Sequence, residues 1–122
     1  MTSVEFAIVL PTLLLIVLGL VEFSRAIWMQ TALDYAVQAA ARCAAVNPSL
    51  CPNVPVYAAS QAFALWFDDP ASVFNRTTGS CSVDADGNAN GIQVNASLPF
   101  DWLVHDLLPY STTLTASACF PR

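Results

Sequence analysis

The chain has 122 residues, enough for one modest domain with an appended helix. Hydrophobic residues make up 56% and charged residues only 11%, and much of this hydrophobic excess lies in the first third of the chain. The cations are four arginines against nine acids, a net charge of -5, so the clustered Lys and Arg that phosphate binding needs are missing. We therefore expect no nucleic-acid partner and no polybasic attachment to anionic lipid.

The first element in chain order is an uncharged apolar run from Phe6 to Val21. Together with the residues before it, the run reaches about twenty residues, which crosses a hydrocarbon layer of roughly 30 Å. A cleaved secretory signal would have a basic start and a small-residue cleavage site. Here the run continues into Glu22 and a further helical pattern. The sequence therefore predicts a retained membrane-spanning helix.

The charges around this run bear on its orientation. Arg25 and Arg42 follow it, which by itself would place the rest of the chain in the cytoplasm. An even set of cysteines in a small domain instead indicates an oxidising compartment. Both observations agree if a short basic leader preceded Met1 and has been removed. A native chain that begins unprocessed at Met1 would contradict this hypothesis.

Three residues give the apolar run features that a simple anchor does not need. Glu5 places a carboxylate near the end of an apolar helix, where charge is costly in lipid and usually marks a function or a partner. In a helical filament, the N-terminal amine of one subunit could pair with this acid on its neighbour and set their axial register. In a lone anchor, Glu5 would lie at the level of the headgroups. Pro11 and Gly19 weaken the helix, as a harmless kink or as a hinge that helps the subunit leave the bilayer.

The helical pattern continues past the apolar run and should end at Asn47-Pro48, because the residue before a proline is pushed away from helical angles. This part has two apolar faces: Phe23, Ala26, Ile27, Gln30, Leu33, Val37, Ala40, Ala41 and Ala44 on one, and Met29, Ala32, Ala36, Ala39 and Cys43 on the other. We expect one face to pack on the chain's own head and the small-residue face to pack on neighbouring helices. Residues 1–47 are thus predicted to form a long helix, and residues 48–122 an outer globular head.

The outer head is predicted to be α+β, with a second helix and a three-stranded antiparallel sheet. The second helix is expected at Val54–Phe67, ended by Asp68-Asp69-Pro70. Alternating patterns predict strands at Ser80–Asp84, Gly91–Leu98 and Thr112–Phe120. Turn-forming residues between the first two strands favour a hairpin.

The cysteines Cys43, Cys51, Cys81 and Cys119 are read as structural disulfides. Four cysteines allow three pairings. We favour Cys43–Cys51, which would close a short loop at the end of the long helix, with Cys81–Cys119, which would join the first strand to the third. A zinc site is disfavoured because CxxC spacing is missing and the chain has a single His.

One segment carries a weak calcium signal. Asp84, Asp86 and Asn88 place oxygen ligands at alternate positions, as calcium loops do. However, Ala89 stands where an EF-hand needs glycine, and the acid at the end of such a loop is also missing. A plain hairpin turn is favoured, and no metal or other cofactor is expected.

Catalysis has little support. His105 follows Asp101 closely and serines are plentiful, but no nucleophile elbow or Gly-rich loop accompanies them. We predict that the chain is not an enzyme.

The long helix resembles the TadE-like pilins of tight-adherence (Tad/Flp, type IVc) pilus systems. The resemblance rests on Glu5-Phe6, Leu10-Pro11, Gly19, Glu22-Phe23 and Arg25. It implies synthesis as a prepilin, cleavage by a prepilin peptidase after a glycine, and assembly by an ATPase-driven machine in the inner membrane. Processed type IV pilins carry their acid at the fifth position, so the resemblance also implies that Met1 is a mature N-terminus.

The sequence therefore favours a pilin or minor pilin that acts in adhesion or surface attachment. It would reside in the bacterial inner membrane before assembly and in an extracellular filament afterwards, with copies of itself and other pilins as partners. The residues assigned to assembly are Met1, Glu5, Phe6, Pro11, Gly19 and Glu22. The alternative is a single-pass membrane protein whose external head binds a ligand and does not polymerise. TadE-like proteins are usually minor pilins beside a much smaller major one. The sequence is therefore compatible with a subunit of the filament shaft and with a subunit of its tip.

Overall fold

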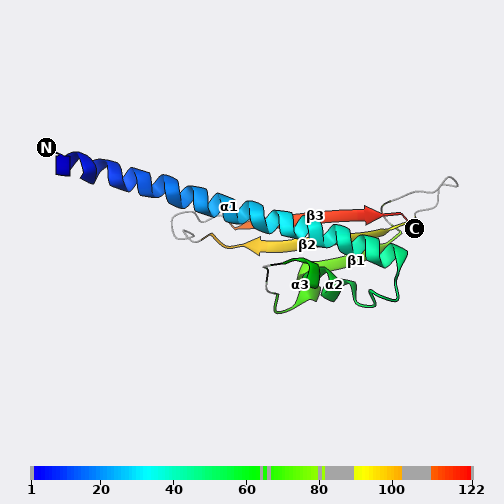
Figure 1. The fold of residues 1–122 in the computed structure, drawn as a ribbon. Helices are drawn as coiled ribbons and strands as arrows, with labels where there is room; N and C mark the ends of the chain where they lie inside the picture. Colours follow the sequence, from blue (N-terminus) through cyan, green and yellow to red (C-terminus); the bar gives the residue numbers. More distant parts are fainter. Residues whose placement is uncertain are drawn as a thin grey trace.

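The computed structural model describes residues 2–63, 65, 67–79, 81, 90–102 and 111–121. Its elements in chain order are α1 (Thr2–Val46), α2 (Val54–Gln61), α3 (Pro70–Val73), β1 (Phe74–Thr78), β2 (Ile92–Phe100) and β3 (Thr112–Phe120). One long helix projects from a small head of short helices and a three-stranded antiparallel sheet (Figure 1). The predicted α+β fold class is confirmed.

The longest element, α1, contains 45 residues, which corresponds to about 67 Å at 1.5 Å per residue. Pro11 lies inside the helix without ending it. The helix ends where the sequence predicts. The Asn47 amide still donates to the carbonyl of Cys43 at 2.9 Å in the helical pattern, but Pro48 has no amide proton with which to continue it. The disulfide Cys43–Cys51 then joins the last turn to the chain that leaves it.

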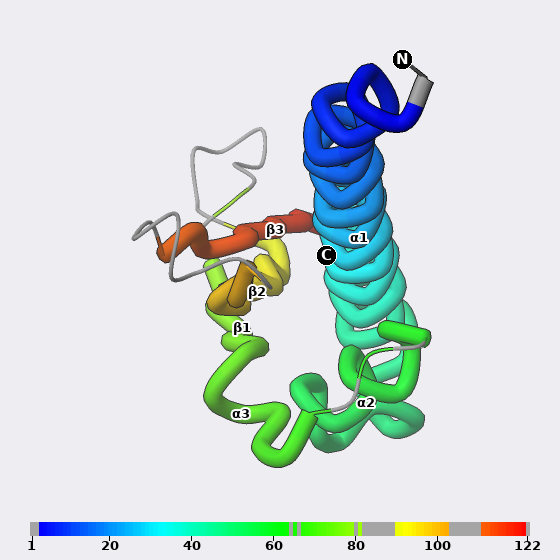
Figure 2. The backbone as a smooth tube through the Cα atoms, turned by 90° about the vertical axis from the view of Figure 1, so that its left-hand side faces the viewer, coloured from blue at the N-terminus to red at the C-terminus, as the bar shows by residue number. Residues whose placement is uncertain are grey.

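The three strands form one antiparallel sheet in the order β1-β2-β3. On β2, Ile92, Val94 and Ala96 are buried while the residues between them are more exposed, as expected for one covered sheet face. Their partners on β3 lie on the same face, for example Ala116 opposite Ala96. The alternation predicted for the second and third strands is confirmed. Figure 2 shows α1 and α2 on the same side of the sheet.

The core lies between this sheet face and the second half of α1. The buried α1 residues are Ala32, Leu33, Ala36, Val37, Ala40, Ala41 and Ala44. All of them except Ala32 belong to one hydrophobic cluster with Val54, Ala58 and Ala62 around α2, and with Phe74 at the start of β1. The expectation that the small-residue face would remain free for neighbouring helices is therefore wrong for Ala32 and Ala36. Both are buried within the chain's own head, where small side chains allow close packing of neighbouring elements.

The first half of α1 is different, because the head does not cover it. From Ser3 to Val21 every residue is exposed except Leu10, which is intermediate. No part of its most apolar 18-residue window is buried. This is the one helix of the described residues that is long and apolar enough to cross a membrane.

The second helix is shorter than predicted: α2 ends at Gln61 rather than Phe67. The chain leaves the helix at Ala62, and Phe63 and Phe67 beyond it pack on other elements. Phe63 contacts the rings of Trp28 and Tyr35 on α1, with centroids 5.6 and 6.4 Å apart. Tertiary packing of aromatic side chains thus overrides the helical spacing. The chain forms α3 after Asp69, a turn that the sequence analysis did not predict.

The first strand also lies elsewhere than predicted. The strand that pairs with β2 is Phe74–Thr78, not Ser80–Asp84, most of which lies outside the described residues. The pattern FNRTT carries no apolar alternation, because only Phe74 is buried and the other four residues are exposed at the sheet edge. The hairpin continues one step beyond the strands, where the Gly79 amide donates to the carbonyl of Gly91 at 2.8 Å. Cys81, beyond this point, is joined to Cys119 of β3.

The position of the core gives a stability prediction. Leu33 is 0% exposed, whereas Leu15, on the uncovered half of the same helix, is 67% exposed. Leu33→Ala should lower the free energy of unfolding of the head by about 2–5 kcal/mol, because it leaves a cavity in the core. Leu15→Ala should leave that free energy unchanged. Denaturant unfolding of both variants in detergent, followed by tryptophan fluorescence, measures the difference, and equal losses would contradict the assignment of the core.

Candidate functional site

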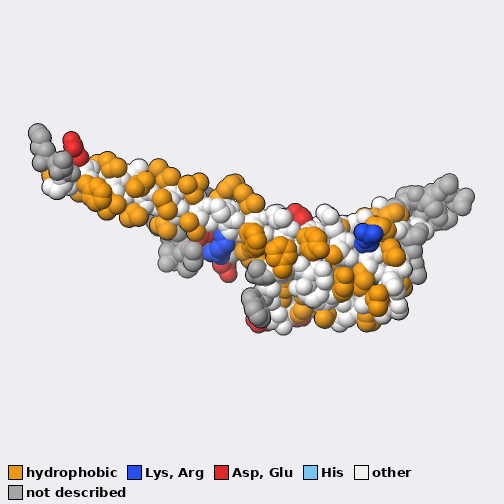
Figure 3. Space-filling model, in the orientation of Figure 1, with side chains coloured by type: hydrophobic (Ala, Val, Ile, Leu, Met, Phe, Trp, Pro, Cys, Tyr) orange, Lys and Arg blue, Asp and Glu red, His pale blue; other side chains and the backbone are white. Residues whose placement is uncertain are grey.

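The residues assigned to assembly lie mostly on the uncovered half of α1. Glu5 and Phe6 are exposed near the free end of the helix, and Met1 lies outside the described residues. Figure 3 shows an acidic side chain at this end, followed by hydrophobic side chains along the whole uncovered half. Glu5 makes no ion pair within the described residues. Pairing of its carboxylate with an amine of another copy stays a prediction.

Gly19 has no packing role within its own chain. A Cβ atom built at this position would meet no atom within 4 Å. Glycine inside a helix lowers helix stability by roughly 0.5–1 kcal/mol relative to alanine. The chain therefore carries a local weakness at Gly19 that nothing in the monomer compensates. Close approach of a second helix or local bending would account for it, and both remain predictions.

The structure places Glu22 apart from the other proposed assembly residues. Its side chain is buried at the point where α1 leaves the head, with 6% of the residue exposed. Within the described residues, neither carboxylate oxygen has a hydrogen-bond partner. The Arg25 Nη1 atom lies 3.6 Å from Glu22 Oε1 and supplies a compensating charge. A buried carboxylate without such a partner would be strongly destabilising.

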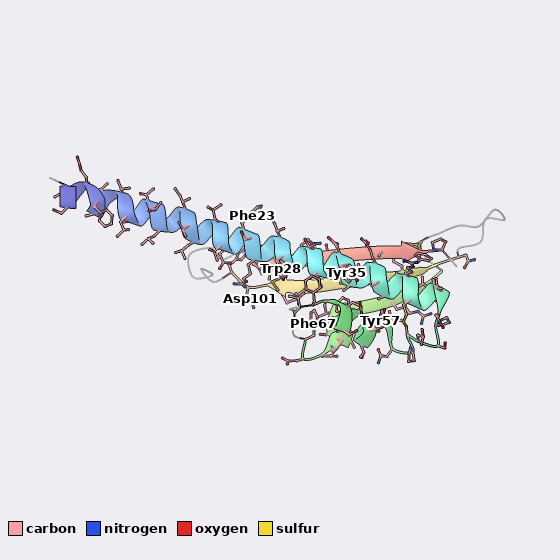
Figure 4. All side chains as sticks on the ribbon, viewed as in Figure 1. Phe23, Trp28, Tyr35, Tyr57, Phe67 and Asp101 are labelled. Carbon is pink, nitrogen blue, oxygen red and sulfur yellow. A yellow bond between two sulfur atoms is a disulfide. The ribbon has the colours of Figure 1, made fainter. Side chains whose placement is uncertain are left out.

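Arg25 connects this carboxylate to the sheet. Its Nη2 atom donates to the backbone carbonyl of Asp101 at 2.9 Å, and its guanidinium lies 4.9 Å above the ring centre of Phe100. Trp102 packs edge-on against Phe100 and donates its indole N–H to the Thr112 hydroxyl at 3.2 Å. We call Glu22, Arg25, Phe100 and Asp101 the junction. It holds the end of β2 against α1, and Figure 4 shows Asp101 beside the start of the uncovered half.

Sequence reasoning assigned Glu22 to assembly and did not predict its contact with Arg25. The only local signal was the i,i+3 spacing of an acid and a base, which on most helices marks an exposed pair of small effect. The contact with Asp101 joins residues far apart in the chain. That proximity follows from how the sheet packs along α1, and no sequence pattern indicates it.

The two weaker chemical signals fall largely outside the described residues. The calcium candidates Asp84, Asp86 and Asn88 lie there, as does His105. In the part of the chain that the structure describes, no group of three or more His, Cys, Asp or Glu residues is arranged to hold a metal ion.

Comparison with known proteins identifies the long helix. The family model described as TadE-like protein matches residues 1–42. Residues 1–42 are therefore similar to TadE-like proteins. The match includes Glu5-Phe6, Gly19 and Arg25, and it confirms the resemblance drawn from these residues. No curated protein and no solved structure matches the chain significantly.

The junction, to which the matched segment contributes Glu22 and Arg25, gives a second stability prediction. Arg25→Ala should lower the free energy of unfolding of the head by about 1–3 kcal/mol, because it leaves Glu22 buried without a charge partner. The expected loss lies toward the lower end of this range, because the Arg25 side chain is 39% exposed and solvent screens its charge. Denaturant unfolding in detergent measures the loss.

Two matched variants separate the buried charge from general packing. Glu22→Gln combined with Arg25→Gln should lose less stability than Arg25→Ala alone, since an uncharged amide then occupies the buried position. Arg76→Ala removes an exposed arginine from β1 and should change the free energy of unfolding by less than about 0.5 kcal/mol. A double variant no more stable than Arg25→Ala would contradict the account of Glu22.

Proposed function

We propose that this protein is a structural subunit, a pilin or minor pilin, of an extracellular type IV/Tad-like pilus. The TadE-like match and the uncovered apolar helix support a Tad pilus-associated membrane protein. In this proposal, residues 1–47 form the membrane and filament-core helix, and residues 48–122 form the extracellular head. The main observation in favour is that the head leaves the first half of α1 bare, while that half carries Glu5.

The bare half of α1 must be covered in the cell. Its exposed side chains include Ile8, Leu14, Ile16 and Leu20, and fully burying each such side chain contributes about 1.5–3 kcal/mol. Soluble monomers rarely expose contiguous apolar patches of this kind. Lipid can cover the bare half before assembly, because about twenty apolar residues match the thickness of a bilayer. Helices of other subunits can cover the same surface in a filament.

Glu5 favours the filament over a permanent lipid environment. A carboxylate on an apolar helix is costly in hydrocarbon, and its attraction to a nearby amine is strong in a low-dielectric filament core. To set an axial register, the N-terminal amine of one copy must pair with Glu5 of another copy. The proposed role therefore gives the acid a purpose that an anchor lacks.

The TadE-like family supports the remaining parts of the proposal. They are processing by a prepilin peptidase, assembly by inner-membrane machinery, and copies of the chain or other pilins as partners. The disulfides Cys43–Cys51 and Cys81–Cys119 suit a head that faces an oxidising exterior. Its role there would be adhesion or surface attachment. We propose no catalytic activity and no cofactor.

Electron microscopy of material sheared from cells, with mass spectrometry of the N-terminus of the sheared chain, tests the proposal directly. A pilus subunit should be recovered in filaments. An anchored binding protein with the same head should stay in the membrane fraction and yield no sheared polymer. That second outcome would contradict the proposed function.

Replacing Glu5 tests the charge on the bare helix. Glu5→Ala should reduce recovered filaments at least about tenfold, because one lost charge partner in a low-dielectric core removes more than roughly 1.4 kcal/mol per subunit. Glu5→Asp keeps the charge and should retain part of the assembly. Protease accessibility of the head checks that both variants still enter the membrane. Filaments of Glu5→Ala in normal number and order would rule out the pairing.

Replacing Gly19 tests whether the bare helix needs a small residue. Gly19→Ala should leave the head as stable as in the original protein, since no atom lies near the position, and should favour the isolated helix by about 1 kcal/mol. Gly19→Leu should behave the same way in the monomer. If a neighbouring helix approaches here, filament recovery should fall from Gly to Ala to Leu. Equal recovery for all three would exclude close packing at Gly19.

A further inference from the structure

A groove in the head, lined by α1, α2 and β3, contains an arginine without a partner among the described residues. The groove has a volume of about 720 Å³, and its lining includes Tyr35 and Arg42 of α1, Tyr57 and Gln61 of α2, and Phe120 of β3. Arg42 is exposed and makes no hydrogen bond or ion pair with any described residue. Because the chain has nine acids and only four cations, an arginine in a groove with no acidic partner is unexpected.

The other arginines differ from Arg42 in their surroundings. Arg25 is engaged in the junction. Arg76 is exposed on the edge strand β1 and does not line the groove. Arg122 lies outside the described residues. Arg42 is therefore the one described cation that lines the groove, has aromatic neighbours there and makes no hydrogen bond or ion pair.

An acid without a partner lies in the turn before α3. Asp68 and Asp69 are both exposed, but Asp69 caps α3 by accepting from the Ala71 amide at 3.0 Å. The Ser72 hydroxyl donates to the Asp69 carbonyl at 2.7 Å. Phe67 anchors the other side of the turn against Phe74, with ring centroids 5.3 Å apart. Asp68 lies between Phe67 and Asp69 and makes no hydrogen bond or ion pair with any described residue.

The groove and this acidic turn lie at different levels along α1. Gln30 donates to the carbonyl of Thr115 on β3 at 2.9 Å. The next residue, Ala116, pairs with Ala96 on β2, and Ala96 pairs with Phe74 on β1. Phe74 is therefore near the level of Gln30, and the acidic turn precedes it by the short helix α3. Arg42 lies on the order of 18 Å further along the helix axis. In Figure 4, Phe67 beside the turn and Tyr57 beside the groove are separated in the same direction.

We propose that the groove around Arg42 receives the Asp68 turn of a second copy of this chain, and that this contact links successive subunits along the filament. The proposal rests on the proposed function. The two surfaces are different parts of the head and carry opposite charge, so their contact is head-to-tail and can continue without closing. The turn is already held in shape by its internal contacts, so little ordering is needed on binding.

Other described acids fit the groove less well. Glu5 lies on the bare helix, Glu22 is buried, and Asp34 is bonded to Gln30. Asp101 is exposed, but its backbone is held in the junction, where Arg25 is the nearer cation. Of the acids that the structure describes in the head, Asp68 is the exposed one that makes no hydrogen bond or ion pair. It therefore is the matched partner for Arg42.

A charge exchange tests the contact. Arg42→Glu and Asp68→Arg should each lower the mass of sheared filament about tenfold at equal expression, and more at low than at high salt, because rim charge pairs are screened. The variant with both changes should recover to within about threefold of the original protein. Arg76→Glu is the matched control, since it makes the same charge change on an exposed residue outside the groove, and it should assemble normally.

A second measurement checks proximity and folding. In cells that produce one chain with Arg42→Cys and another with Asp68→Cys, filaments should contain disulfide-linked pairs. Both positions are exposed, so the variants should retain the unfolding midpoint of the original head. Normal filaments from both single charge variants, failure of the double variant to recover, or a defect of Arg76→Glu equal to that of Arg42→Glu would overturn the contact. Absence of filaments from the original protein would instead contradict the proposed function, and this contact with it.

Discussion

The packing of the second half of α1 against the sheet and α2 is the constraint on which the rest of the structure depends. Leu33, Val37 and Ala40 are fully buried there, and their contacts bring together strands that are distant in the chain. Without this packing, a three-stranded sheet with one polar face would have no core. The same packing stops short of the first half of α1, so one continuous helix occupies two environments.

The junction lies at the boundary between these environments. Arg25 balances the buried Glu22, holds the Asp101 carbonyl and covers the Phe100 ring, so four interacting groups meet where α1 leaves the head. At the other end of the head, Cys43–Cys51 ties the last turn of α1 to the following chain. The junction and this disulfide restrain rotation of α1 relative to the head. A subunit whose bare helix sets its position in an assembly would benefit from that rigidity, because displacement of the helix is then transmitted to the head.

The candidate site was only partly predictable from the sequence. The apolar run, Glu5, Pro11 and Gly19 stand out because they lie on a single local element with a known period. Glu22 was grouped with them from the family pattern, yet its side chain is buried within its own subunit against Arg25. The Arg42 groove combines residues of α1, α2 and β3, so no local pattern could indicate it.

The sequence by itself determined the elements whose signals are local: the long helix and its end at Asn47-Pro48, the two alternating strands, and the α+β class. Cysteine number and spacing favoured the disulfide pairing that the structure contains. Only the tertiary structure decided where β1 lies, because a short edge strand buries one residue and shows no alternation. It also decided the end of α2, since Phe63 and Phe67 gain more from packing on α1 and β1 than from a continued helix. Which α1 residues face inward depended on the same packing.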